Sequence, residues 1–143
     1  MAFLCMILIF FSVELIDNLV SKMSKGKAPG LDELSTEHLK FCHPVIIVIL
    51  SKLFNVFLSQ GYIPAGFGLS YTIPIPKCDV HSRALTVGDF RGISISPVIS
   101  KLFELAVLDR FARFLQTSDH QFGCKKQLSC RHAIYSLRNM IDH

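Results

Sequence analysis

Apolar residues recur at helical spacing over most of this chain. A helix is predicted wherever they return every three or four positions between a capping residue and a glycine or proline. Five segments meet this condition: residues 13–23, 31–41, 45–60 and 98–115, and a last segment that Ser129 caps and that continues to Ile141. Helix is therefore the main secondary structure that the pattern predicts.

The segment 45–60 is apolar on nearly every side. Pro44 suits the first turn of a helix and Gly61 suits its end, so both boundaries are well marked. A helix without a polar face is expected to be buried, and we expect this one to be the central helix of the core. It is too short to span a bilayer, and Lys52 lies in its middle.

Two short runs, 71–75 and 90–95, are rich in β-forming residues and are predicted strands of a hairpin that projects from the helices. Pro74 and Pro76 remove backbone donors, so the first strand is expected to be an edge. Lys77 and Arg91 lie close to the end of this hairpin, and two cations brought together there would hold a phosphate-bearing ligand. The predicted fold class is α+β, mostly helical.

Charge is distributed unevenly along the 143 residues. From Lys77 onward there are ten Lys and Arg against six Asp and Glu, so the whole formal excess of +4 falls in this half. A polyanionic partner would be attracted there, although an ordinary solvated basic surface has the same composition. The length suits one domain or one lobe of a larger domain, and 50% apolar residues suffice for a core.

Other kinds of site find little support. The five cysteines form no C-x-x-C pair, and their odd number favours a reducing compartment. Cys124 and Cys130 could share a metal with His120 and His132, but the spacing is looser than in most such sites. No nucleophile triad and no phosphate-binding glycine loop of the Walker or dinucleotide type occurs, so no catalytic and no metal-binding residue is assigned.

Residues 1–11 are continuously apolar. They lack the basic start and the cleavage site of a secretory signal and are too short for a membrane span, so a membrane association is not expected. They are either an accident of the reading frame or a buried segment, with a signal anchor as the alternative. We therefore treat 1–11 separately from a domain over 12–143.

Four motifs occur in a fixed order: Lys25-Gly-Lys-Ala-Pro-Gly-Leu-Asp32, Tyr71-Thr-Ile-Pro-Ile-Pro-Lys77, Asp89-Phe-Arg-Gly-Ile-Ser-Ile-Ser96 and His120-Gln-Phe-Gly-Cys-Lys-Lys126. Together they resemble the reverse transcriptase of non-LTR (LINE-type) retrotransposons, over roughly residues 13–143. The resemblance implies the fingers subdomain of a right-hand polymerase and the entry to its palm, truncated before the catalytic palm strands.

The resemblance also implies roles for individual residues. Lys77 and Arg91 would contact the triphosphate of the incoming deoxynucleoside triphosphate. Contacts with the template would come from Lys25, Lys27, Gln121, Gly123, Lys125 and Lys126, with Gly26 and Gly30 allowing the backbone to approach it. The family more often has Pro-Asp-Gly where this chain has Leu31-Asp32-Glu33, and an ordinary connection between helices is the alternative for this loop.

In the family, divalent magnesium is held by aspartates that follow the last motif found here. The expectation is a reverse transcriptase fragment that keeps contacts to RNA template, DNA primer and nucleotide, uses no small-molecule cofactor, and cannot polymerise alone. Such a protein would be intracellular, in the nucleus or the cytoplasm. The alternative is a non-catalytic helical module, taken over for another role, that binds RNA or a protein partner.

Overall fold

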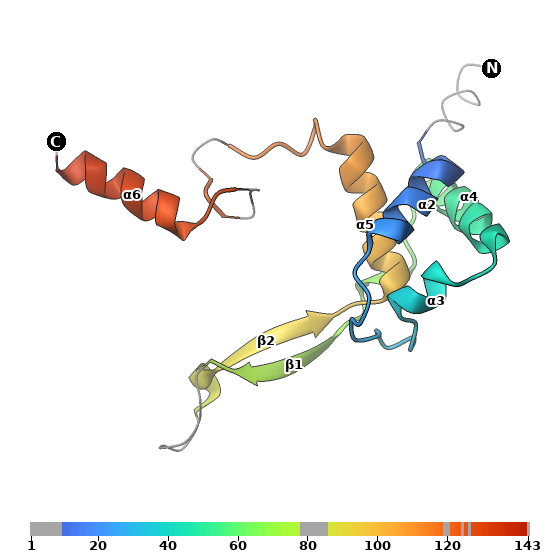
Figure 1. Ribbon diagram of the computed structural model, residues 1–143, viewed down its shortest axis with the longest axis horizontal. Helices are drawn as coiled ribbons and strands as arrows, with labels where there is room; N and C mark the ends of the chain where they lie inside the picture. The colour runs from blue at the N-terminus through green and yellow to red at the C-terminus, as the bar shows by residue number, and fades with distance from the viewer. Residues whose placement is uncertain (1–9, 78–85, 119–120, 124, 126, 143) are drawn as a thin grey trace. The chain divides into compact units, whose positions relative to one another are not determined.

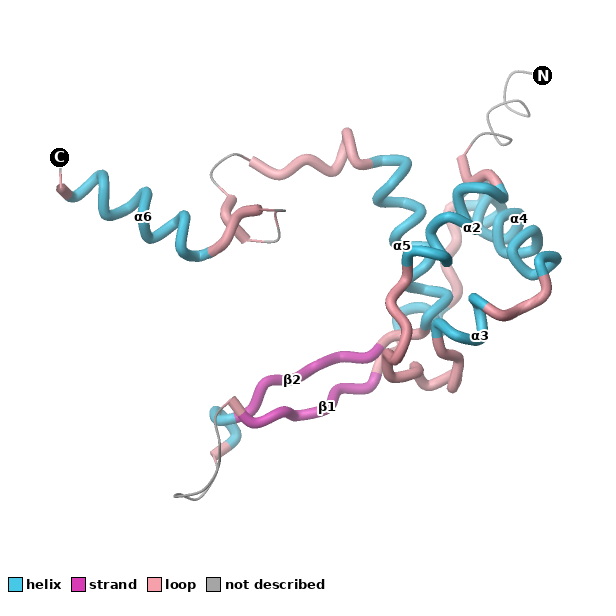
Figure 2. The backbone as a smooth tube through the Cα atoms, in the orientation of Figure 1, coloured by secondary structure: helices cyan, strands magenta, loops and turns pink. Residues whose placement is uncertain are grey.

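The computed structural model describes residues 10–77, 86–118, 121–123, 125 and 127–142. These residues form five α-helices and one antiparallel hairpin, which confirms the predicted mostly helical α+β class (Figures 1 and 2). The order is α2 (Val13–Lys22), α3 (Thr36–Lys40), α4 (Pro44–Gln60), β1 (Tyr71–Pro76), β2 (Phe90–Ile95), α5 (Val98–Phe111) and α6 (Cys130–Ile141), with short 3-10 helices η1 (Ala65–Gly68) and η2 (Val87–Asp89).

The chain divides into two compact units, Met1–Arg110 and Phe111–His143. The first holds α2 to α4, the hairpin and nearly all of α5, and the second holds α6. Among the described residues, no helix combines the length and the apolar character needed to cross a membrane. Of the apolar segment 1–11, residues 1–9 lie outside the described residues.

The predicted helix boundaries are confirmed at several caps. Ser12 accepts a hydrogen bond from the backbone N–H of Leu15 at the start of α2, and Gly61 ends α4 with a left-handed φ of 60°. Three predicted helices are too long: α2 ends at Lys22, α5 ends at Phe111, and α3 begins only after Ser35. Residues 31 and 32 instead form a turn, which a hydrogen bond from Glu33 N–H to the Gly30 carbonyl closes at 3.1 Å, and Glu33 takes a φ of 58°.

The core lies among α2, α4 and α5 and is rich in phenylalanine. Phe11, Phe54 and Phe103 pack edge to face, with ring centroids 5.1–6.3 Å apart. Two polar residues of α4 fix the chain at Phe11: Ser51 donates to the Phe11 carbonyl at 2.7 Å, and Asn55 both donates to that carbonyl and accepts from the Phe11 N–H. The polar positions that interrupt the apolar run of α4 therefore attach the start of α2 to the core.

The prediction that α4 is buried on all sides is wrong for the described structure. Its inner face carries buried Ile47, Leu50, Phe54 and Phe57. On the opposite face, Val45, Ile49 and Val56 are each about half exposed, at 51%, 51% and 52%. Sequence pattern alone does not separate a helix that is covered on all sides from one whose second apolar face is uncovered.

The hairpin pairs Tyr71 with Ile95 at one end and Pro76 with Phe90 at the other. Lys77 N–H donates to the Asp89 carbonyl at 2.8 Å, so Lys77 and Asp89 form a hydrogen-bonded pair. Because hydrogen-bonded and non-hydrogen-bonded pairs alternate along antiparallel strands, Pro74 and Pro76 both fall in non-hydrogen-bonded pairs. Pro74 and Pro76 thus lack donors only on the outer edge of β1, as predicted for an edge strand. Neither strand contains a buried residue.

Candidate nucleic-acid interface

The two predicted nucleotide-binding cations lie at the same end of the hairpin. Arg91 pairs with Ile75 across the strands, and Lys77 follows Ile75 by two positions. Because paired residues and residues two apart share a face, Lys77 and Arg91 project from the same face as diagonal neighbours, which typically lie about 7–8 Å apart with their Cβ atoms somewhat closer. Both side chains are exposed. The local geometry therefore places both cations on one exposed face at the end of the hairpin.

Hydrogen bonds close the end of this hairpin. The ammonium group of Lys77 donates to the Gly88 carbonyl at 2.7 Å. The carboxylate of Asp89 accepts from the N–H of Thr86 at 2.9 Å and from its hydroxyl at 2.8 Å. The backbone N–H of Thr86 is the main reason that the pKa of Asp89 lies below its ordinary value. This carboxylate is thus engaged in shaping the turn beside the two cations.

The lysine-rich loop between α2 and α3, residues 23–35, is held by hydrogen bonds at two points. Gly26, with a φ of 71°, donates its N–H to the carboxylate of Glu37 at 2.6 Å, and this bond is the main cause of a lowered pKa for Glu37. At the other end Tyr71 donates its hydroxyl to the Pro29 carbonyl at 2.9 Å. The loop is therefore attached both to α3 and to the root of the hairpin.

Gly30 makes the closest of these contacts. It is buried, and a Cβ built on it would lie 2.8 Å from Cα and 2.9 Å from N of Pro97, between β2 and α5. The sequence predicted that Gly30 lets the backbone approach a template. In the structure, the missing side chain lets the backbone of the loop pack closely against Pro97.

A basic hollow of about 420 Å³ lies between this loop and α5. Its lining includes Lys22 from the end of α2, Lys27 from the loop and Lys101 from α5, with Glu104 as its acidic residue. None of the three lysines forms an ion pair with a described residue. Sequence reasoning had selected Lys27 but missed Lys22 and Lys101, because only the tertiary fold brings them to the same hollow.

Lys25 occupies a different position from Lys27. Its ammonium group lies 5.0 Å from the centre of the Phe41 ring, over one face. Both Lys25 and Lys27 are exposed. The structure therefore places the two lysines of the motif at two hollows, one that reaches α5 and one that lies beside α3.

The remaining predicted template residues belong to the second unit and are described within it alone. Gln121 donates its side-chain N–H to the Gly123 carbonyl at 3.0 Å, and Lys125 donates to the Ser118 carbonyl at 2.8 Å. These bonds fold the loop before α6 upon itself. Lys126, Cys124 and His120 lie outside the described residues, and no group of three or more potential metal ligands occurs in the part of the chain that is described.

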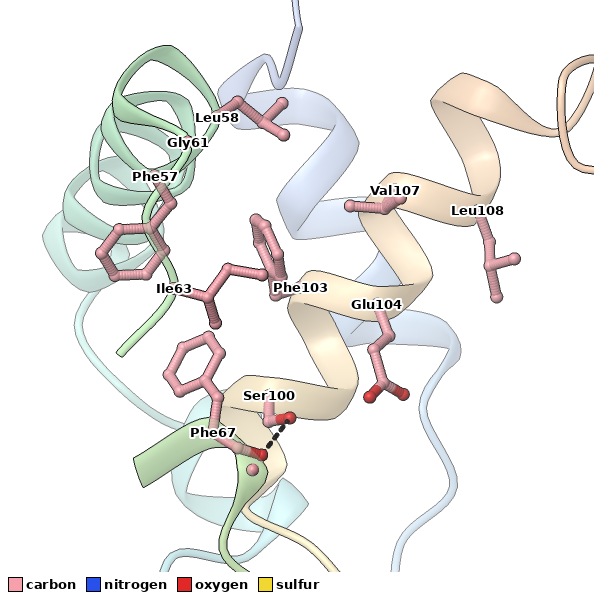
Figure 3. Close-up of a pocket in the computed structure, with 11 residues that line it drawn as sticks. Phe57, Leu58, Gly61, Ile63, Phe67, Ser100, Phe103, Glu104, Val107 and Leu108 are labelled. Carbon is pink, nitrogen blue, oxygen red and sulfur yellow. Dashed lines mark hydrogen bonds between the residues drawn. The ribbon is translucent and has the colours of Figure 1, made fainter. Parts of the chain in front are cut away.

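A third hollow, of about 780 Å³, is apolar (Figure 3). Phe57, Phe67 and Phe103 face it from three segments, and Ser100 donates to the Phe67 carbonyl at 3.2 Å beside it. Glu104 is the charged residue among its lining. A wall of this composition offers nothing to neutralise a phosphate, so the chemistry of phosphate binding is confined to the lysine- and arginine-bearing surfaces.

No family model matches the chain. It is 30% identical over 99 residues to an RNA-directed DNA polymerase from the mobile element jockey of Drosophila funebris, and 29% identical over 112 residues to a probable RNA-directed DNA polymerase from transposon X-element of Drosophila melanogaster. A putative 115 kDa protein in type-1 retrotransposable element R1DM of Drosophila melanogaster is 25% identical over 116 residues.

These alignments cover 69%, 76% and 81% of this chain but only 11%, 12% and 11% of the three relatives. The chain thus spans about a tenth of the length of the curated relatives it matches. The similarity confirms the resemblance that the four motifs suggested.

Proposed function

Because the curated homologues of this chain are RNA-directed DNA polymerases of non-LTR retrotransposons, we propose that it is a part of such a polymerase that holds the incoming nucleotide and the template. The first unit corresponds to the fingers of a right-hand polymerase. The alternative of an unrelated helical module is not favoured by these homologues. RNA template, DNA primer and deoxynucleoside triphosphate are the proposed partners.

The observation that carries the proposal is the placement of Lys77 and Arg91 on one exposed face at the end of the hairpin. Phosphoryl transfer develops negative charge on the triphosphate, and cations fixed before the reaction stabilise that charge. A guanidinium binds two phosphate oxygens at once, while an ammonium acts as a point charge. The pair is suited to hold the β- and γ-phosphates of a nucleotide.

The basic hollow supplies a second set of contacts. Lys22, Lys27 and Lys101 would neutralise consecutive phosphates of the template, which fixes its position without reading its sequence. Gln121, Gly123, Lys125 and Lys126 would border the template from the second unit. Divalent magnesium belongs to the complete polymerase, and no step of this proposal passes through a metal held by the described residues.

The proposal is tested by measuring triphosphate binding to the full chain. Replacing Arg91 or Lys77 by alanine removes one charge-assisted contact, and we expect the affinity to fall roughly 10- to 100-fold for each. Arg91→Lys should recover only part of this loss, because it keeps the charge but not the two-pronged contact. Lys52→Ala is the matched control: Lys52 is exposed on α4 and lines neither the hollow that contains Lys27 nor the hollow that contains Lys25.

Lys52→Ala should bind the triphosphate within twofold of the parent. If Lys77→Ala and Arg91→Ala bind as well as Lys52→Ala, the hairpin end does not hold the nucleotide. Oligonucleotide binding by the same variants provides the second readout. Oligonucleotide affinity should fall less than triphosphate affinity in the two hairpin variants, because the hollow lysines that they leave intact are the proposed template contacts.

A further inference from the structure

Phe41 is an aromatic side chain that the fold leaves uncovered. It is 75% exposed, although its backbone is well fixed: its N–H donates to the Glu37 carbonyl at 3.0 Å at the end of α3, and α4 begins three residues later at Pro44. Its neighbours Leu39 and Cys42 are buried or half-buried. The position is therefore held firmly while the ring faces solvent.

Two lysines line the hollow to which this ring belongs. The ring lines this hollow of about 410 Å³ together with Lys25 and Lys40, and Asp17 is the acidic residue of the lining. Lys25 covers one face of the ring at 5.0 Å, and Lys40 is fixed by a 2.8 Å hydrogen bond from its ammonium group to the Ser21 carbonyl. The exposed Phe41 ring thus has one ammonium group over one face, and a second lysine from a different segment lines the same hollow.

The composition of this site differs from that of the exposed outer face of α4. The outer face of α4 carries aliphatic Val45, Ile49 and Val56, a surface suited to another apolar surface. A flat ring beside cations suits a ligand with a flat face and negative charge. Single-stranded nucleic acid has both, because its bases stack on aromatic rings while lysines hold its phosphates.

We propose that Phe41 stacks on a base of single-stranded nucleic acid, with Lys25 and Lys40 holding the neighbouring phosphates. The inference rests on the proposed template binding and extends it to a base contact on the α3 side of the loop. Lys25 and Lys27 belong to one motif, so a strand that contacts Lys27 in its hollow continues past Lys25 to the ring. The contact is with any base, since every base has a stacking face.

The test compares two oligonucleotides of equal length and charge, one of ten thymidines and one of ten abasic sites. With the full chain, Phe41→Ala should weaken binding of the thymidine oligomer roughly 5- to 100-fold, the range for a stacking aromatic. Binding of the abasic oligomer should be unchanged, and so should the salt dependence, because no charge is removed. Phe41→Trp should keep the affinity and show fluorescence quenching by the bases.

Phe114→Ala is the matched control, since Phe114 is a phenylalanine with a similar exposure of 78%, and it should bind both oligomers like the parent. Lys25→Gln should weaken both oligomers and reduce the salt slope by roughly 0.7. A parent chain that binds neither oligomer would contradict the proposed function itself. If the parent binds both but Phe41→Ala binds the thymidine oligomer equally well, or loses both oligomers to the same extent, base stacking is overturned while template binding remains.

Discussion

Replacing Gly30 by alanine tests whether the lysine-rich loop is locked to the start of α5. The added Cβ would lie 2.8 Å from Cα of Pro97, about 0.6 Å inside the 3.4 Å at which ordinary contact begins. The opposing atoms are backbone, and Pro97 is buried and accepts a hydrogen bond from Lys101 N–H in α5 at 3.2 Å. They cannot move aside as a flexible side chain would.

The magnitude follows from two opposing effects. Forcing a methyl group into a packed site costs about 1–3 kcal/mol, whereas replacing glycine by alanine restricts the unfolded chain and returns about 0.4–1 kcal/mol. The φ of Gly30 lies outside the left-handed region, so no backbone strain is added. We expect a net loss of about 1–2 kcal/mol in the free energy of unfolding, which lowers the melting temperature by roughly 4–8 °C.

Urea unfolding and thermal unfolding followed by circular dichroism both measure this loss. Gly66→Ala is the control, because a Cβ at Gly66 meets no atom within 4 Å and the φ of Gly66 also lies outside the left-handed region. Gly66→Ala should be neutral or slightly stabilising. Equal stability of Gly30→Ala and Gly66→Ala would refute the close contact between the loop and Pro97.

Two further predictions concern the loop and the hairpin. The Gly26 N–H lowers the pKa of Glu37, so the hydrogen bond between them is complete above pH 4.5 and is lost as the pH falls through the lower folded-state pKa. The NMR chemical shift of the Gly26 amide should therefore titrate with a midpoint below pH 4.5, and a midpoint at or above 4.5 would contradict this hydrogen bond. Pro74→Val restores a backbone N–H donor on the outer edge of β1 and should increase self-association, measured by sedimentation velocity. The control Ile75→Val should not, and equal self-association of the two variants would show that Pro74 does not protect that edge.

The local elements could be predicted from the sequence because local chemistry determines them. Pro44 and Gly61 mark the ends of α4, and the hairpin strands follow from their β-forming residues. The shared face of Lys77 and Arg91 follows once the register is known. That register depends on the number of residues between the strands and on the turn that Asp89 and Thr86 close.

The tertiary features could not be predicted in this way. Lys22 and Lys101 are far apart in the sequence, and each alone is an ordinary surface lysine at a helix position. Gly30 was predicted to let the backbone approach a template, but in the structure a Cβ at this position would meet Pro97, which lies far away in the sequence. The exposed face of α4 was missed for a related reason, since burial depends on which elements are present to cover a helix.

Gly30 and Tyr71 connect the two proposed binding surfaces mechanically. The loop that carries Lys27 contacts Pro97 at the exit of β2 and accepts a hydrogen bond from Tyr71 at the entry of β1. From Tyr71 the strand extends about 20 Å to Lys77, at roughly 3.3 Å per residue. A template held by the loop lysines and a triphosphate held by Lys77 and Arg91 would thus be positioned by one shared attachment, the contacts of the loop with Tyr71 and Pro97. A shift of the hairpin at Tyr71 would move the loop with it. In the polymerase proposed for this chain the incoming nucleotide would have to meet the template base that selects it, and this shared attachment would help to keep the two aligned.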